Sequence, residues 1–237
     1  MDSFGEDAAA SYDDSPRGDE AATVALLEQL ARGGPALELA IGTGRIALPL
    51  AARGVRVHGI DLSPAMVARL RTKPGGADLP VTMGDFATVP VEGTYRLIYL
   101  VFNTLFNLLT QDEQVRCFEN VALHLSEDGL FVVEAFVPTF LHRLRDDQYV
   151  DAEYVEVDHV QLDVGRHDPV AQRLDESHVA LTPKGLRFDP IVCRYAWPSE
   201  LDLMARIAGL RLHERWGGWQ REPFTAVSRN HVSVYGR

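Results

Sequence analysis

The sequence predicts an α/β protein with a doubly wound, mostly parallel seven-stranded sheet and an antiparallel β insertion. Short apolar runs alternate with helix-like patterns over the first 136 residues, which indicates βαβ crossovers and hence parallel strands. From about residue 149 to 197, polar and apolar residues alternate with a period of two, which is typical of antiparallel strands. The length of 237 residues fits one large domain that carries an inserted piece.

Seven apolar runs supply the strands of the predicted main sheet. They are residues 36–40, 55–60, 79–83, 95–102, 129–136, 211–216 and 231–235. The run at 129–136 is almost unbroken, as expected for a strand that is buried on both faces.

Helical patterns fill the intervals between these strands. They cover residues 19–32, 45–53, a stretch from 64 onward, 111–125 and 199–208. Short polar side chains precede three of these helices and are expected to cap them, namely Asp19, Ser63 and Ser199. Pro64 stands at the first helical position, which favours proline.

The strand-rich insertion changes its side-chain phase part-way. Val155 and Val157 share one phase, whereas Val160 and the apolar residues after it share the other, so we expect a bulge or bend near 158–159. Two further strands, 171–182 and 185–195, are expected to be joined by a turn at Pro183–Gly185. The expected organisation is a flexible arm (1–18), a core (19–147 and 196–237) and the insertion (148–195).

Composition and charge limit the function classes. Hydrophobic residues make up 46% and charged residues 24%, and the formal net charge of -11 argues against nucleic-acid or anionic-membrane partners. The acidic N-terminus contains no targeting signal, and no apolar run approaches the ~20 residues of a membrane span. The eight histidines form no metal-binding pair on one helix face, so no metal is predicted. We therefore expect a cytoplasmic protein without metal.

The segment Glu38–Gly44 ends a strand and opens a helix. Gly42 and Gly44 allow a tight turn and a close backbone approach to a ligand, and the helix N-terminus offers free N–H groups. Residues 42–47 also fit the dinucleotide fingerprint G-x-G-x-x-A. A tight strand-to-helix turn without a ligand is the alternative interpretation.

Acidic residues stand at three successive strand ends. Glu38 is followed by Asp61 at the end of the second strand and by Asp85 after the third. A carboxylate at the position of Asp61 accepts hydrogen bonds from ribose hydroxyls, although it also suits a helix cap. Asp85 can accept from the amino group of adenine, with Phe86 against the ring. All three lie at the edge where doubly wound sheets bind ligands.

Residues 35–136 resemble the core of class I S-adenosylmethionine-dependent methyltransferases, which are Rossmann-like. The resemblance lies in an acidic residue followed by spaced small residues, and Ala40 stands where glycine is common. It implies that S-adenosylmethionine is the cofactor and S-adenosylhomocysteine the product. The residues that it places around this cofactor are Glu38, Ala40, Gly42, Thr43, Gly44, Asp61, Leu62, Met66, Gly84, Asp85, Phe86, Phe102, Asn103 and Thr104.

The insertion resembles the antiparallel lid of small-molecule methyltransferases, including those that act on amino sugars in natural-product pathways. In such enzymes the lid closes over the acceptor and often contributes to a homodimer. Methyl transfer to a nitrogen or an oxygen of a small secondary metabolite is therefore expected.

Four residues are candidates for the acceptor side. His142 and Tyr12 are the candidate catalytic groups, because a base helps when the acceptor is an ammonium or a hydroxyl. Phe136 and Trp219, together with these two, are candidate substrate contacts. A solvated histidine and ordinary packing residues are the alternative interpretations.

Two other functions use the same glycine turn. A nicotinamide-dependent oxidoreductase also needs the turn and Asp61, but no Tyr-x-x-x-Lys or similar hydride-transfer pair is recognisable. A non-catalytic protein that kept the nucleotide-binding fold is the second alternative.

Overall fold

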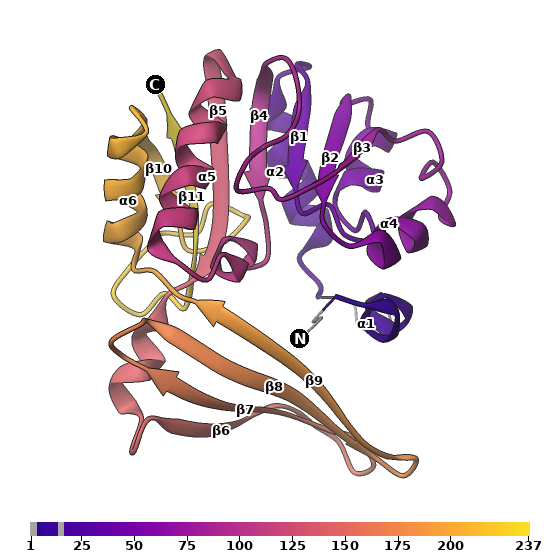
Figure 1. Ribbon diagram of the computed structural model, residues 1–237, viewed down its shortest axis with the longest axis vertical. Coiled ribbons are helices and arrows are strands. Elements are labelled where there is room, and N and C mark those ends of the chain that lie inside the picture. The colour runs from indigo at the N-terminus through magenta and orange to yellow at the C-terminus, as the bar shows by residue number, and fades with distance from the viewer. Residues whose placement is uncertain (1–3, 14–16) are drawn as a thin grey trace.

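The computed structural model describes residues 4–13 and 17–237 and contains two sheets. The main sheet has seven strands in the order β10-β11-β5-β4-β1-β2-β3, and the small sheet has the order β6-β7-β8-β9. Figure 1 shows the small sheet beside one end of the main sheet rather than stacked on its face. The predicted fold class is confirmed.

The main sheet is parallel except at one side. Its strands are β1 (Ala36–Leu39), β2 (Val57–Asp61), β3 (Val81–Met83), β4 (Tyr95–Leu100), β5 (Leu125–Phe136), β10 (Arg211–Trp216) and β11 (Asn230–Gly236). Strand β11 runs antiparallel to both β5 and β10, whereas β1 to β5 pair in parallel. The carboxyl ends of β1 to β5 therefore meet at one edge of the sheet.

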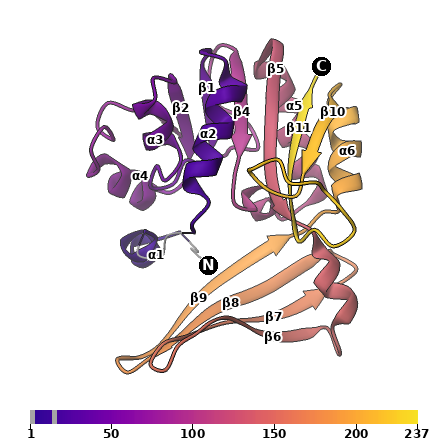
Figure 2. The ribbon, with the colours of Figure 1, turned by 180° about the vertical axis from the view of Figure 1, so that it is seen from behind.

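Helices cover both faces of this sheet, each over its own apolar core. The helices are α1 (Glu6–Ser11), α2 (Glu20–Ala31), α3 (Ala47–Ala52), α4 (Pro64–Arg71), α5 (Gln111–His124) and α6 (Pro198–Ile207), with 3-10 helices η1 (Thr104–Asn107) and η2 (Pro138–Arg143). One core contains residues of α5 and α6, and the other contains residues of α2, α3 and α4. Figure 2 shows α2 on the face opposite α5.

The predicted helix caps differ in outcome. Ser63 caps α4 as expected, because its Oγ accepts a hydrogen bond from the Met66 N–H at 3.2 Å. The side chain of Asp19 makes no capping bond and pairs instead with Arg45. Helix α6 begins earlier than expected, with Trp197 rather than Ser199 as its N-cap. Pro198 suits the first helical position and sets this earlier start.

The N-terminal segment contains a helix that the sequence did not predict. Residues 6–11 form α1, which contacts α4 near the carboxyl edge of the main sheet (Figure 1). Positions 1–3 and 14–16 of the expected arm lie outside the described residues.

The small sheet is an antiparallel meander of four strands. Its strands are β6 (Gln148–Val155), β7 (Val160–Asp168), β8 (Arg173–Thr182) and β9 (Gly185–Arg194). The phase change that suggested a bulge or bend is the turn between β6 and β7, where Val155 pairs with Val160. Two strands on either side of a turn have independent phases, so the feature expected near 158–159 is a turn between two strands and not a bulge or bend. The predicted turn at 183–185 is confirmed.

The two faces of the small sheet have different surroundings. We define the inner face by Tyr149, Asp163, Leu174, Glu176, His178 and Cys193, which share one side through the register of the four strands. Leu174, Tyr149 and Cys193 pack against the apolar core that holds η1 and β5. The inner face therefore continues from the carboxyl edge of the main sheet.

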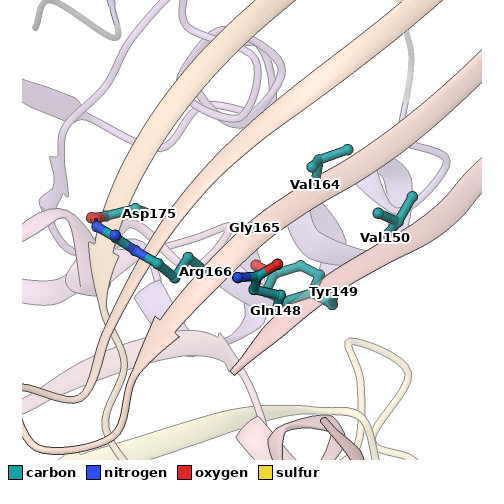
Figure 3. Close-up of a pocket in the computed structure, with 7 residues that line it drawn as sticks. All are labelled: Gln148, Tyr149, Val150, Val164, Gly165, Arg166 and Asp175. Atoms are coloured by element: carbon teal, nitrogen blue, oxygen red, sulfur yellow. Dashed lines mark hydrogen bonds and ion pairs between the residues drawn. The ribbon is translucent and has the colours of Figure 1, made fainter. Parts of the chain in front are cut away.

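The outer face carries exposed apolar side chains. Val150 is 69% exposed and Phe188 is 61% exposed. Figure 3 shows Val150, Val164, Gln148 and Arg166 around a shallow hollow of about 520 Å³ on the small sheet.

Candidate functional site

The turn after β1 bends through three residues in the left-handed region. Ala40 has a φ of 55°, Gly42 of 57° and Gly44 of 78°. Glycine reaches these angles without steric cost, whereas Ala40 adopts a conformation that strains an L-residue. A side-chain atom added at Gly42 would meet nothing within 4 Å. The space beside Gly42 is thus open to a bound molecule.

Asp61 fixes this turn from the end of β2. Its Oδ2 accepts a hydrogen bond from the Gly42 N–H at 2.6 Å, and its Oδ1 accepts one from the Ser63 N–H at 2.8 Å. The side chain is buried, and this burial raises the pKa of the carboxyl group. A carboxylate has about four acceptor positions, so acceptor capacity remains for a ligand's hydroxyl group.

Glu38 brings a second buried carboxyl group to the adjacent strand. Its Oε2 accepts a hydrogen bond from the Tyr99 hydroxyl at 2.9 Å, and the side chain is 2% exposed. Burial raises the pKa of Glu38 to about 8. A positively charged group bound beside Glu38 would therefore strongly stabilise the negative form of this carboxyl group.

The loop after β4 is held in an unusual backbone shape. Phe102 and Asn103 both have positive φ angles, of 56° and 60°. The Glu134 carboxylate accepts a hydrogen bond from the Phe102 N–H at 2.6 Å and another from the Trp219 indole N–H at 2.9 Å. The Asn103 Oδ1 accepts a bond from the Phe136 N–H at 2.6 Å. Two neighbouring segments thus fix the loop in place.

The N-terminal segment lies across the glycine turn. Asp13 accepts hydrogen bonds from the Thr43 hydroxyl at 2.7 Å and from the Lys73 ammonium at 2.9 Å. The Lys73 ammonium also donates to the Thr43 carbonyl at 2.7 Å. Burial raises the pKa of Asp13, but the hydrogen bonds from Lys73 and Thr43 lower it more, so the pKa is below its ordinary value. The Ser63 hydroxyl donates to the Phe4 carbonyl at 2.6 Å. Neither Asp13 nor Lys73 was a sequence-predicted site residue.

The Arg17 guanidinium group lies over the loop after β4, where Phe102 is a predicted cofactor contact. Arg17 stands over the Phe102 ring, 3.0 Å from its centroid, and over the Tyr12 ring at 5.3 Å. Arg45 pairs with Asp19 at 3.0 Å, which anchors the start of α2 to the turn. The structure therefore brings Tyr12 close to Phe102.

The remaining predicted cofactor residues differ in exposure. Asp85 is exposed and its Oδ1 accepts from the Ala87 N–H at 2.8 Å, while Phe86 packs against the core beside α5. Leu62 is 71% exposed, whereas Met66 is buried inside the fold. Gly84 donates its N–H to the Asp61 carbonyl, which places the end of β3 beside that of β2.

The acceptor-side candidates fall into separate places. His142 is exposed on η2 and its ring stacks on Trp197 with centroids 5.3 Å apart. Phe136 packs edge-on against Phe106 and Phe140 below the carboxyl edge. Trp219 is 6% exposed and points its N–H at Glu134. Among the described residues, Trp219 and His142 share no hydrogen bond or ring contact.

The chain matches a family model over part of its main sheet and a solved structure over nearly its whole length. Residues 36–129 match a model described as a methyltransferase domain. The CcbJ methyltransferase from Streptomyces caelestis is 39% identical, and the alignment covers 99% of this chain and 97% of that one with a TM-score of 0.92.

The chain belongs to the S-adenosylmethionine-dependent methyltransferases. The methyltransferase is also similar to the cypemycin N-terminal methyltransferase of a Streptomyces species, at 27% identity over 205 residues (86% of this chain and 84% of the relative). It shares its fold with the amino pentose methyltransferase CalS10 of Micromonospora echinaspora, at 24% identity and a TM-score of 0.69, over 98% and 96% of the two chains.

The site of this methyltransferase fits its cofactor, S-adenosylmethionine. The glycine turn leaves open space at Gly42, and the buried carboxyl groups of Glu38 and Asp61 stand on neighbouring strands beside it. Two such carboxylates can accept hydrogen bonds from an ammonium group and from the hydroxyl groups of a ribose. Among the described residues, no helix is long and apolar enough to cross a membrane.

Proposed function

We propose that this methyltransferase transfers a methyl group to a nitrogen or an oxygen of a small secondary metabolite by in-line displacement. The observation that carries this proposal is the pair of buried carboxyl groups around an open glycine turn. The cypemycin relative is named for methylation at an N-terminus, which favours nitrogen as the acceptor atom.

The donor contacts of the proposal are those that the resemblance to the family implies, and the position of Glu38 and Asp61 on neighbouring strands supports them. Glu38 is assigned to the amino end of the methionine part and Asp61 to the ribose. Phe86 and Asp85 are assigned to the adenine. The full set of donor contacts is Glu38, Ala40, Gly42, Thr43, Gly44, Asp61, Leu62, Met66, Gly84, Asp85, Phe86, Phe102, Asn103 and Thr104.

The protein's part in the reaction is mainly alignment. S-adenosylmethionine supplies a methyl group on a positively charged sulfur, which is already activated for displacement. Glu38 and Asp61 fix the two ends of the donor site, and the loop held by Glu134 borders it. The N-terminal segment, anchored through Asp13, excludes water from the turn. Tyr12, Phe136, His142 and Trp219 remain predictions for the acceptor side.

Binding of the product S-adenosylhomocysteine tests the proposal directly. Calorimetric titration is expected to show saturable binding of S-adenosylhomocysteine and no comparable heat with NAD. Replacement of Asp61 by Ala is expected to abolish this binding, while the exposed Asp112→Asn variant serves as the control and binds normally. Tight NAD binding without S-adenosylhomocysteine heat would identify an oxidoreductase, the alternative that the relatives do not favour.

We further propose that the outer face of the small sheet joins two copies of the chain. Its exposed apolar side chains, Val150, Leu186 and Phe188, are of the kind that marks contact surfaces. Sedimentation velocity is expected to show a dimer for the native chain and a monomer for Phe188→Glu. A native monomer contradicts this assignment.

Two further assignments belong to the same proposal. Residues 19–147 and 196–237 form the donor-binding core, residues 148–195 form a substrate lid, and 1–18 form an arm that closes the site. The thiols of Cys117 and Cys193 are free, which agrees with the reducing cytoplasm in which we place the reaction.

A further inference from the structure

The inner face of the small sheet carries a hydrogen-bonded histidine that the donor site does not use. The His178 Nδ1 lies 2.6 Å from the Asp163 Oδ1, and the two residues are direct partners across β7 and β8. This Nδ1–Oδ1 distance is that of a strong hydrogen bond in which Nδ1 carries the proton. The pair thus fixes the tautomer of the ring and turns Nε2 into an acceptor.

The second ring nitrogen is available. The His178 Nε2 lies 3.7 Å from the Glu176 Oε1, which is beyond hydrogen-bonding distance. The side chain of His178 is 38% exposed, so the nitrogen is accessible from outside the sheet. Glu176 itself is held, because the Tyr149 hydroxyl donates to its other oxygen.

The position of this histidine relates it to the donor site. Tyr149, which holds Glu176, packs edge-on against Phe140 with ring centroids 5.7 Å apart. Phe140 in turn packs against Phe136, at the end of β5. The inner face is therefore tied by aromatic contacts to the carboxyl edge, and Glu176 and His178 follow Leu174 outward along the same face.

We propose that His178 contacts the acceptor through Nε2, with Asp163 as the residue that positions its ring. The proposal rests on the proposed methyl transfer and names the acceptor group as a hydrogen-bond donor, an ammonium or a hydroxyl. An ammonium fits best, because carboxylates surround the imidazole.

The charges that face His178 come from all four strands. They are Glu153 on β6, Asp163 on β7, Glu176 on β8, and Asp189 on β9, which pairs with Arg187. The hydrogen bond to Asp163 raises the pKa of His178. Nε2 accepts a hydrogen bond only when the ring is neutral, so acceptor binding is expected to strengthen as the pH rises through this pKa.

A bound cation does not explain the arrangement equally well. Glu153, Asp163 and His178 bring one ligand-type atom each within 4.8 Å of one another. However, the short Nδ1–Oδ1 contact requires a proton between these two atoms, so Nδ1 and Asp163 already satisfy each other and His178 offers an ion only Nε2.

The test uses the S-adenosylhomocysteine-loaded full chain and NMR of the His178 imidazole, identified by its loss in His178→Gln. The probes are D-glucosamine, glycinamide and triglycine, each compared with its N-acetyl counterpart. At least one free amine is expected to shift the His178 signals saturably and to lower the pKa of His178. Its acetylated counterpart is expected to cause neither change. Asp163→Asn is expected to weaken that binding by about 10-fold or more, the effect of one charge-assisted hydrogen bond.

The neighbouring Ser177→Ala variant is the matched control, because Ser177 follows Glu176 on the opposite face of the same strand. It is expected to bind the amine as the native chain does. For any amine that is methylated, His178→Gln is expected to raise KM about 10-fold while kcat changes less than about twofold.

Three results overturn the proposal: no probe perturbs His178, the acetylated probes bind equally, or Ser177→Ala weakens binding as much as Asp163→Asn. Loss of S-adenosylhomocysteine binding by the native chain would instead contradict the proposed function, and calorimetry records it separately.

Discussion

Glu134 accepts the indole N–H of Trp219 at 2.9 Å although the two residues lie on different segments of the chain. The other oxygen of the same carboxylate accepts the Phe102 N–H. Trp219 therefore orients the group that fixes the loop after β4. Burial raises the pKa of Glu134, so the negative form depends on these two donors.

Replacement of Trp219 by Phe tests this relationship. The ring volume is largely kept, but the N–H donor is lost, so the loop after β4 is expected to loosen. We expect S-adenosylhomocysteine affinity to fall about 5- to 20-fold, as for a lost hydrogen bond to a charged group of about 1–2 kcal/mol. Calorimetry measures it, with Trp197→Phe as the control. Unchanged affinity with normal folding would show that the loop does not depend on Trp219.

Replacement of Ala40 by Gly is expected to stabilise the protein. Ala40 has a φ of 55°, which costs an L-residue about 1–3 kcal/mol, whereas glycine adopts it freely. The greater freedom of glycine in the unfolded chain offsets about 0.4–1 kcal/mol of this gain. We expect a net increase of about 1 kcal/mol in the free energy of unfolding, measured with urea. Ala51→Gly, inside α3, is the control and should destabilise.

Glu38 is expected to make stability fall as the pH rises. Its pKa is about 8 in the folded chain and 4.5 is the ordinary value, so between these values the folded state keeps a proton that the unfolded state releases. The free energy of unfolding therefore declines over this window, by at most about 1.4 kcal/mol per pH unit from this group. Glu38→Gln retains the acceptor for Tyr99 and should flatten the decline in urea titrations of the ligand-free protein.

His231 is expected to act in the opposite direction at acid pH. Burial and the nearby Arg215 lower the pKa of His231 to about 3, from an ordinary value of 6.5. Between these values the unfolded chain binds a proton at His231 and the folded chain does not. The free energy of unfolding therefore falls as the pH falls from about 6.5 toward 3. His231→Asn should reduce this acid loss, whereas the exposed His142→Asn should not. Equal acid sensitivity of both variants would contradict the assignment.

Local signals predicted much of the donor site. The residue types of Ser63 and Pro64 predict the start of α4 correctly. The apolar run before Asp61 predicts that this residue ends a strand, as it does. The bond from Gly42 to Asp61 follows from parallel pairing of β1 and β2. Periodicity and capping chemistry act over a few residues, which is why these features are readable.

Contacts between distant residues were not predictable in the same way. Asp13 meets Lys73 across 60 residues, and Glu134 meets Trp219 across 85, with no pattern linking either pair. The turn at 156–159 was missed because its one usual turn residue, Asp158, has no glycine or proline beside it. The inner-face pair of His178 and Asp163 depends on the register of β7 and β8, which the connection at 169–172 determines.

The small sheet leaves and rejoins the main fold at neighbouring points. Arg145 forms a β-bridge with Gln148 where the small sheet begins. Tyr195 follows the last strand of this sheet, and its hydroxyl is hydrogen-bonded to His167, which lies beside the beginning of the sheet. Residues 148–194 are therefore a module with two adjacent joints, and exchanging it breaks no pairing of the seven main strands. With the proposed lid role, recombination between related genes that replaces this module as a unit is expected to change the acceptor and leave the donor site intact.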